Sequence, residues 1–110
     1  MADLFSSIRV LDGGMGYLLM DLGYSIDGDP LWSARLLQKD PETVKKAHRL
    51  WLESGAEILE TNSYQASMAV LMREGLDRDG AKRTLASSVT LARGVADEWR
   101  KENGEVTSVV

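Results

Sequence analysis

Short apolar segments rich in β-branched residues alternate along this chain with longer segments of helical composition, and glycines close several of them. Residues 8–12, 56–61 and 106–110 have the composition of strands, and helical patterns lie between them. Strand, helix, strand, helix, strand in this order is typical of parallel βαβ units with right-handed crossovers. The alternation therefore predicts an α/β fold.

The longest helical segments carry recognisable start and stop signals. Asp40 suits an N-cap, Pro41 suits the first helical position, and Gly55 suits the end of that helix. A longer helix is expected from Asp77 to about Gly104. Shorter helices are expected at 15–22, 31–37 and 65–74, the first closed by Gly23 and the last by Gly75. The apolar faces of the two long helices should comprise Val44, Ala47, His48, Trp51 and Leu52, and Ala81, Leu85, Val89, Ala92, Val95, Ala96 and Trp99.

Three strands do not complete a parallel sheet of this kind. Such a sheet is covered by helices on both faces or closes into a barrel, whereas three strands leave two open edges and expose apolar surface. We therefore expect the 110 residues to be the front part of a larger α/β fold. Alone, the chain should be marginally stable and should self-associate through its open sheet edges.

Composition and charge narrow the classes of function. The chain has 13 basic and 17 acidic side chains, and a net charge of -4, so no nucleic-acid partner is expected. The sequence contains no apolar stretch long enough to span a bilayer and no secretory signal at its start, which predicts a cytoplasmic protein without a membrane partner. Because cysteine is absent, this chain alone cannot form a disulfide or a thiolate metal site.

Polar residues and glycines follow the first two predicted strands. The first ends in Asp12, Gly13 and Gly14, and the second ends in Glu60, Thr61 and Asn62. Functional groups of parallel α/β folds gather at the carboxyl ends of strands, so these residues should converge at one mouth. Carboxylates there can bind an ammonium group, while exposed backbone amides or a hydroxyl can bind a carboxylate. This set suits a small zwitterion, although both carboxylates could instead cap neighbouring turns.

Two further features favour structural interpretations. The glycine cluster at 13–16 begins like a dinucleotide-binding fingerprint, but Leu19 replaces its third glycine, so a tight strand-to-helix turn is the better interpretation. The single histidine, His48, lies on the apolar face of a predicted helix without a second ligand at helical spacing. A buried, hydrogen-bonded structural histidine is therefore expected rather than a metal ligand.

Four sequence blocks in order resemble the start of a homocysteine S-methyltransferase. They are Leu11–Gly16, Asp29–Ala34, His48–Leu52 with Ser54–Leu59, and Thr61–Ser67. This family includes S-methylmethionine- and betaine-dependent enzymes and the homocysteine-binding module of cobalamin-dependent methionine synthase. The resemblance covers residues 8 to 106, which is about the first third of the family's domain.

The resemblance implies the N-terminal portion of a (β/α)8 TIM barrel, about two and a half βα units, so that residues 1–110 form a partial homocysteine-binding domain. In the family, the residues that match Asp12 and Gly13 contact the amino-acid moiety of homocysteine. The positions of Glu60 and Thr61 line the same pocket, and Gln65 falls where some members place a residue near the methyl donor.

The implied reaction moves a methyl group from S-methylmethionine, S-adenosylmethionine or betaine to homocysteine, giving methionine. In the family a zinc ion held by three cysteines of later strands activates the thiol, and this sequence has no cysteine. A whole barrel needs about 250 residues. Three hypotheses follow. The chain is part of a zinc-dependent enzyme and inactive in isolation, or it is a non-catalytic truncated isoform or fragment that acts at most as a binding or interaction module. The third hypothesis is a small independent α/β domain without a pocket.

Overall fold

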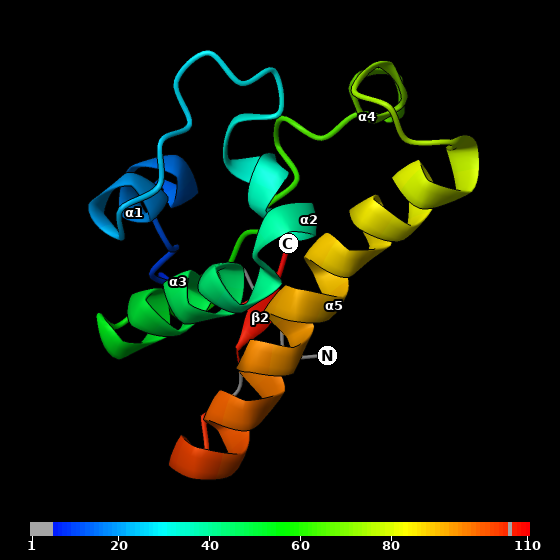
Figure 1. Cartoon of the computed structure of the whole chain (residues 1–110). Coiled ribbons are helices and arrows are strands. Elements are labelled where there is room, and N and C mark those ends of the chain that lie inside the picture. The colour runs from blue at the N-terminus through cyan, green and yellow to red at the C-terminus, as the bar shows by residue number, and fades with distance from the viewer. Residues whose placement is uncertain (1–5, 106) are drawn as a thin grey trace.

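A computed structural model describes residues 6–105 and 107–110 of the chain. Helices make up most of it and pack around two very short strands (Figure 1). In chain order the elements are α1 (Met15–Asp21), the 3-10 helix η1 (Trp32–Arg35), α2 (Leu36–Lys39), α3 (Pro41–Glu53), β1 (Ile58–Leu59), α4 (Met68–Arg73), α5 (Arg78–Asn103) and β2 (Ser108–Val109).

The two strands are parallel, as the alternation predicts. Ile58 pairs with Ser108 and Leu59 with Val109. On the other side of β1, Leu11 forms an isolated parallel bridge with Ile58, and the Asp12 N–H donates to the Ile58 carbonyl at 3.0 Å. Three extended segments therefore lie side by side in chain order, with β1 in the middle.

The prediction of a buried first strand at 8–12 is wrong. The segment forms one bridge rather than a strand, Ile8 is 98% exposed, and Val10 and Leu11 are also exposed. The segment at 8–12 is exposed rather than buried because, among the described residues, it pairs with β1 on one side and with no strand on the other. The second and third predicted strands also shrink, to 58–59 and 108–109, and residue 106 lies outside the described residues.

Helices α3 and α5 pack against each other and form the largest helical contact of the fold (Figure 1). The Asp40 side chain accepts the Thr43 N–H at the start of α3, and Pro41 is the first helical residue, as predicted. Gly104 closes α5 with a φ of +73°, a left-handed conformation that favours glycine. The apolar face of α3 is confirmed. On α5 the exposed Val89 departs from the prediction, and Thr84 and Ser88 are buried instead.

Buried apolar side chains form two clusters. The larger contains Leu19, Leu31 and Leu71 and joins α1, α2, α4 and α5. The smaller, formed by Leu52, Leu59, Val95 and Ala96, joins β1 to α3 and α5. Leu59 is fully buried. The second cluster therefore anchors the strand whose end carries Glu60 and Thr61. No helix within the described residues has the length and apolar character needed to cross a membrane.

Candidate functional site

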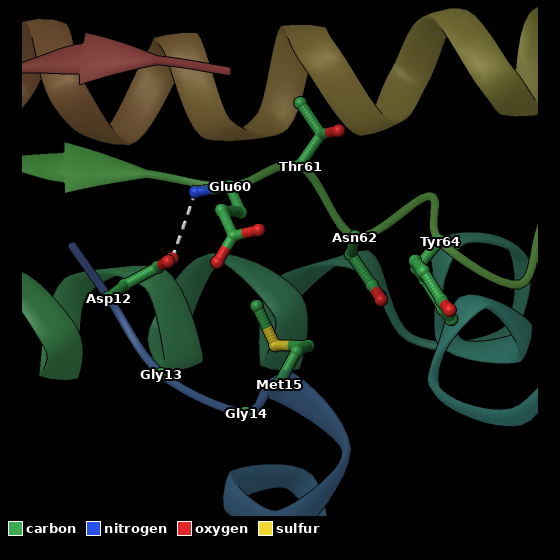
Figure 2. A pocket seen from close by; sticks show the side chains of 8 residues that line it. All are labelled: Asp12, Gly13, Gly14, Met15, Glu60, Thr61, Asn62 and Tyr64. Carbon is green, nitrogen blue, oxygen red and sulfur yellow. Dashed lines mark hydrogen bonds between the residues drawn. The ribbon is translucent and has the colours of Figure 1, made fainter.

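The carboxyl ends of the first two extended segments border one small cavity. Its volume is about 220 Å³. The lining consists of Asp12, Gly13, Gly14, Met15, Glu60, Thr61, Asn62 and Tyr64 (Figure 2). Four of the five residues predicted to bind substrate thus lie together, and their proximity follows from the parallel pairing of Leu11 with Ile58.

The fifth predicted residue, Gln65, does not line this cavity. It lies in a turn before α4, which begins at Met68 because the Ser67 side chain accepts the Val70 N–H as its N-cap. The predicted helix from residue 65 is therefore wrong at its start. The expected role of Gln65 near a methyl donor stays a prediction.

Asp12 is tied to the end of β1 and keeps one oxygen unused. Its Oδ2 accepts the Glu60 backbone N–H at 3.0 Å (Figure 2). The residue is 8% exposed, and Oδ1 is buried without a hydrogen-bond partner among the described residues. The capping interpretation from the sequence therefore holds for one oxygen of Asp12, and the other remains an unsatisfied acceptor beside the cavity.

Burial raises the pKa of Asp12 to about 6, because a buried carboxylate loses hydration. The Glu60 backbone N–H opposes this rise by donating to the carboxylate, and the negative charge of the Glu60 carboxyl adds to it. Glu60 itself is exposed. In Figure 2 its side chain extends from the strand end toward the turn at Gly13 and Gly14. The cavity thus holds two neighbouring carboxyl groups, and no Lys, Arg or His lines it among the described residues.

Gly13 allows α3 to approach the turn that borders the cavity. A Cβ placed on Gly13 would lie 2.5 Å from Cη2 of the Trp51 ring, closer than real carbon contacts. Trp51 is half-buried, and its Nε1 has no partner among the described residues. The glycine is therefore required by close packing of the indole.

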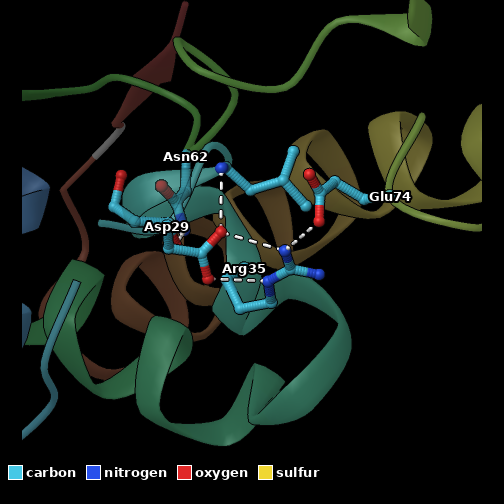
Figure 3. Close-up of polar contacts among 6 residues, drawn as sticks. Asp29, Arg35, Asn62 and Glu74 are labelled. Atoms are coloured by element: carbon cyan, nitrogen blue, oxygen red, sulfur yellow. Dashed lines mark hydrogen bonds and ion pairs between the residues drawn. The ribbon is translucent and has the colours of Figure 1, made fainter. Parts of the chain in front are cut away.

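Polar contacts stabilise the loop after β1, whose residues Asn62 and Tyr64 line the cavity (Figure 3). Asn62 is buried, and its Nδ2 donates to the Ser33 carbonyl at 2.9 Å. Arg35, two residues after Ser33, forms two ion pairs. Its Nε lies 2.7 Å from Asp29 Oδ2, and its Nη2 lies 3.0 Å from Glu74 Oε2. These bonds connect η1 to the end of β1 and to the region after α4.

Asn62, Tyr64 and Met15 are cavity residues that the prediction of binding residues omits. Asn62 directly follows Thr61 at a predicted strand end, and this position is the signal that points to it. Tyr64 and Met15 carry no such signal, since their placement depends on how the turn and α1 fold back.

The described residues do not form a metal site. They contain no group of three or more His, Cys, Asp or Glu side chains with a suitable arrangement, and the chain has no cysteine. His48 is fully buried, as predicted, but neither ring nitrogen has a hydrogen-bond partner among the described residues, so the expected hydrogen bond is wrong. Burial lowers the pKa of His48 to about 4, which keeps the ring neutral at pH 7.

A cavity at the carboxyl ends of parallel segments, lined by carboxyl groups and glycines, is the arrangement of α/β proteins that bind small polar molecules. Comparison with known proteins identifies the family. The model of the family described as homocysteine S-methyltransferase matches residues 9–110. The chain therefore belongs to the homocysteine S-methyltransferase family.

Curated relatives and solved structures agree. The chain is 42% identical over 93 residues to homocysteine S-methyltransferase 1 of Brassica oleracea, covering 84% of this chain and 28% of that protein. It is 34% identical over 103 residues to the Escherichia coli homocysteine S-methyltransferase, covering 94% and 33%. The metallated crystal form of the E. coli homocysteine methyltransferase MmuM superposes with a TM-score of 0.86 at 33% identity, over 97% of this chain and 38% of that chain. The chain thus spans about a third of the relatives' length.

Proposed function

We propose that the chain supplies the amino-acid-binding part of a homocysteine S-methyltransferase. The observation that carries the proposal is the convergence of Asp12, Gly13, Glu60 and Thr61 on one cavity, in a chain of this family. In this proposal residues 1–110 are a partial homocysteine-binding domain, the N-terminal portion of a (β/α)8 barrel in the cytoplasm. The parallel order of the three extended segments and the TM-score of 0.86 to MmuM support it.

The cavity groups match the two charges at the amino-acid end of homocysteine. The Asp12 and Glu60 carboxyls suit the ammonium group, and the Gly13 and Gly14 backbone N–H groups suit the carboxylate. Thr61 also lines the cavity, but its hydroxyl forms a hydrogen bond with Ser63 Oγ at 2.7 Å, and in Figure 2 its side chain lies on the opposite side of the strand end from Glu60. With that end held, the substrate sulfur points out of the cavity toward a methyl donor. There the thiol loses its proton to solvent, and the thiolate sulfur forms a bond to the methyl carbon. The bond between that carbon and the donor's sulfonium or ammonium centre breaks, and its electron pair stays on the donor sulfur or nitrogen.

The donor in this proposal is S-methylmethionine, S-adenosylmethionine or betaine, with Gln65 on the donor side. Thiol activation by zinc is left to polypeptide outside residues 1–110, because the residues of this chain do not fit a zinc ion. No step of the reaction is therefore assigned to a metal held here.

A chimeric enzyme tests this proposal. Residues 9–110 replace the matched segment of the E. coli homocysteine methyltransferase, and methyl transfer to homocysteine is measured. We expect transfer to persist, and Asp12→Ala in the chimera to lower kcat/KM by about 100-fold, because a charged substrate group loses its partner.

Asp97→Asn is the matched control in that chimera, since Asp97 is an exposed carboxylate on α5, far along the chain from the cavity residues. A folded, metal-loaded chimera without methyl transfer would refute the proposal. Equal effects of Asp12→Ala and Asp97→Asn would refute the assignment of Asp12.

The exposed sheet edge favours a second candidate function, that of a binding or interaction module. Ile8, Val10 and Leu11 are exposed, and among the described residues the first segment pairs with β1 on one side only. Such an edge can pair with another chain. In this case the isolated chain self-associates. Sedimentation velocity should show species larger than a monomer that diminish when Val10→Lys places a charge on the edge. A monomer at every concentration, with a cooperative thermal melt, would contradict this candidate.

A further inference from the structure

The cavity at the end of β1 is lined by two carboxyl groups, and no positively charged lining residue among the described residues compensates them. Asp12 and Glu60 both line it, and Asp12 is more than nine-tenths buried with Oδ1 unpartnered. No Lys, Arg or His side chain lines the cavity among the described residues. Met15 of α1, which lines the cavity, and Trp51 of α3, which packs against Gly13, are uncharged. Two carboxylates in such a place need a positive partner.

A proton or an ammonium group can meet this need. When the cavity is empty, a proton on the pair removes one of the two negative charges. When a substrate ammonium enters, both carboxylates can stay ionised, because the cation compensates them. The two states exclude each other, so the arrival of the ammonium expels the proton to solvent.

The two carboxyls are not equivalent in this exchange. Asp12 Oδ2 is engaged by the Glu60 N–H at 3.0 Å, which fixes the Asp12 carboxyl against the strand end. Glu60 is exposed, and in Figure 2 its side chain extends from the strand end toward the turn at Gly13 and Gly14. Glu60 is therefore the freely accessible carboxylate, and Asp12 is the buried one that makes an uncompensated pair unfavourable.

We propose that Glu60 is a specificity-determining residue that selects substrates with an ammonium group, and that it does so with Asp12 as a carboxyl pair exchanging a shared proton for that ammonium. This inference rests on the proposed function and adds to it the role of Glu60 and a linkage to protons. The burial of Asp12, which raises its pKa to about 6, places the exchange near neutral pH. Affinity for an ammonium ligand should therefore rise as pH increases from 5 to 7.5.

Calorimetric titration of the 110-residue chain tests this inference with two ligands. Homocysteine carries the ammonium group, and 4-sulfanylbutanoic acid lacks it but is otherwise the same. We expect homocysteine affinity to rise by about tenfold from pH 5 to pH 7.5 with net proton release, seen as a binding enthalpy that depends on the ionisation enthalpy of the buffer. The affinity of 4-sulfanylbutanoic acid should not rise over the same range.

Glu60→Gln should lower homocysteine affinity by about tenfold or more at pH 7.5, because one charged partner of the ammonium is lost. The rise of affinity with pH should become smaller and shift to lower pH, because the negative charge of Glu60 no longer adds to the effect of burial on Asp12. Glu60→Asp should recover part of the affinity. Asp97→Asn, which removes an exposed charge elsewhere, should change neither ligand's binding. Amide spectra of each variant confirm that it stays folded.

The outcomes separate the two proposals. Homocysteine that binds with unchanged affinity to Glu60→Gln, or binds without proton release, overturns the inference and leaves the proposed function standing. Equal losses for homocysteine and 4-sulfanylbutanoic acid also overturn it, since Glu60 would then act only on structure. No homocysteine binding by the folded wild-type chain refutes the proposed function itself, and the inference falls with it.

Discussion

Gly13→Ala will destabilise the chain by about 2 kcal/mol, although it adds a single methyl group. The new Cβ would lie 2.5 Å from Cη2 and 2.9 Å from Cζ2 of Trp51, so the indole or the turn must move. The indole ring is rigid and belongs to the cluster around Leu59, so its displacement disturbs the packing of α3 on β1. Urea unfolding followed by circular dichroism measures the free energy of unfolding.

Gly94→Ala is the matched control, because a Cβ on Gly94 has no heavy atom within 4 Å and Gly94 lies inside α5. It should stabilise the chain by about 0.5–1 kcal/mol, since alanine favours a helix over glycine. Combining Gly13→Ala with Trp51→Phe should recover part of the loss through a favourable coupling energy. Additive effects of the two substitutions would contradict the steric explanation.

The second large effect comes from His48, whose replacement by methionine should stabilise the chain, and more so in acid. His48 is fully buried with both ring nitrogens unpartnered, so an apolar side chain of similar volume removes an unsatisfied polar group. The gain should be about 1–2 kcal/mol at pH 7.

The direction in which the contribution of His48 to stability changes with pH follows from the shift in its pKa. The folded-state pKa of His48 is lowered from 6.5 to about 4, so its contribution to stability is present above pH 6.5 and is lost as pH falls toward 4. His48→Met should therefore gain about 2 kcal/mol more over the wild type at pH 5 than at pH 7. Unfolding curves at pH 7, 6 and 5 measure this gain. A constant difference between the two proteins would contradict the burial of an unpartnered imidazole.

The contribution of Asp12 to stability changes with pH in the direction opposite to that of His48, so Asp12 serves as the control. Its folded-state pKa is raised from 3.8 to about 6, so its contribution is present below pH 3.8 and is lost as pH rises through 6. Asp12→Asn keeps an oxygen for the Glu60 N–H and removes the charge, and it should gain more over the wild type at pH 7 than at pH 5. In the wild type, the stability lost through His48 as the pH falls from 7 to 5 is largely offset by the stability gained through Asp12 over the same range.

Local signals made the helices of this chain predictable. Asp40 and Pro41 start α3 because capping and a fixed φ act within a few residues, and the left-handed turn at Gly104 ends α5 for the same reason. The convergence of Asp12 and Glu60 was predictable too, since it needs only that two neighbouring segments run parallel.

Features that depend on partners across the fold were not predictable. The exposure of Ile8 and Leu11 depends on which segments pair with the first one and which side stays open, and composition does not encode this. The absence of a hydrogen-bond partner for His48 within the described residues depends on three-dimensional packing, as does the 2.5 Å approach at Gly13. The apolar pattern of α3 placed His48 inside but carried no information on its polar neighbours.

Homocysteine titration of the ¹⁵N-labelled chain locates the amino-acid-binding site residue by residue, because each backbone amide gives a separate signal. We expect saturable shifts confined to the cavity, at Gly13, Gly14, Glu60 and Thr61. Amides of a second cavity, which is lined by Tyr24, Asp29, Arg35 and Lys39 among other residues, should not move. A folded chain whose cavity amides do not respond, or whose shifts gather at the second cavity instead, would contradict this assignment of the binding site.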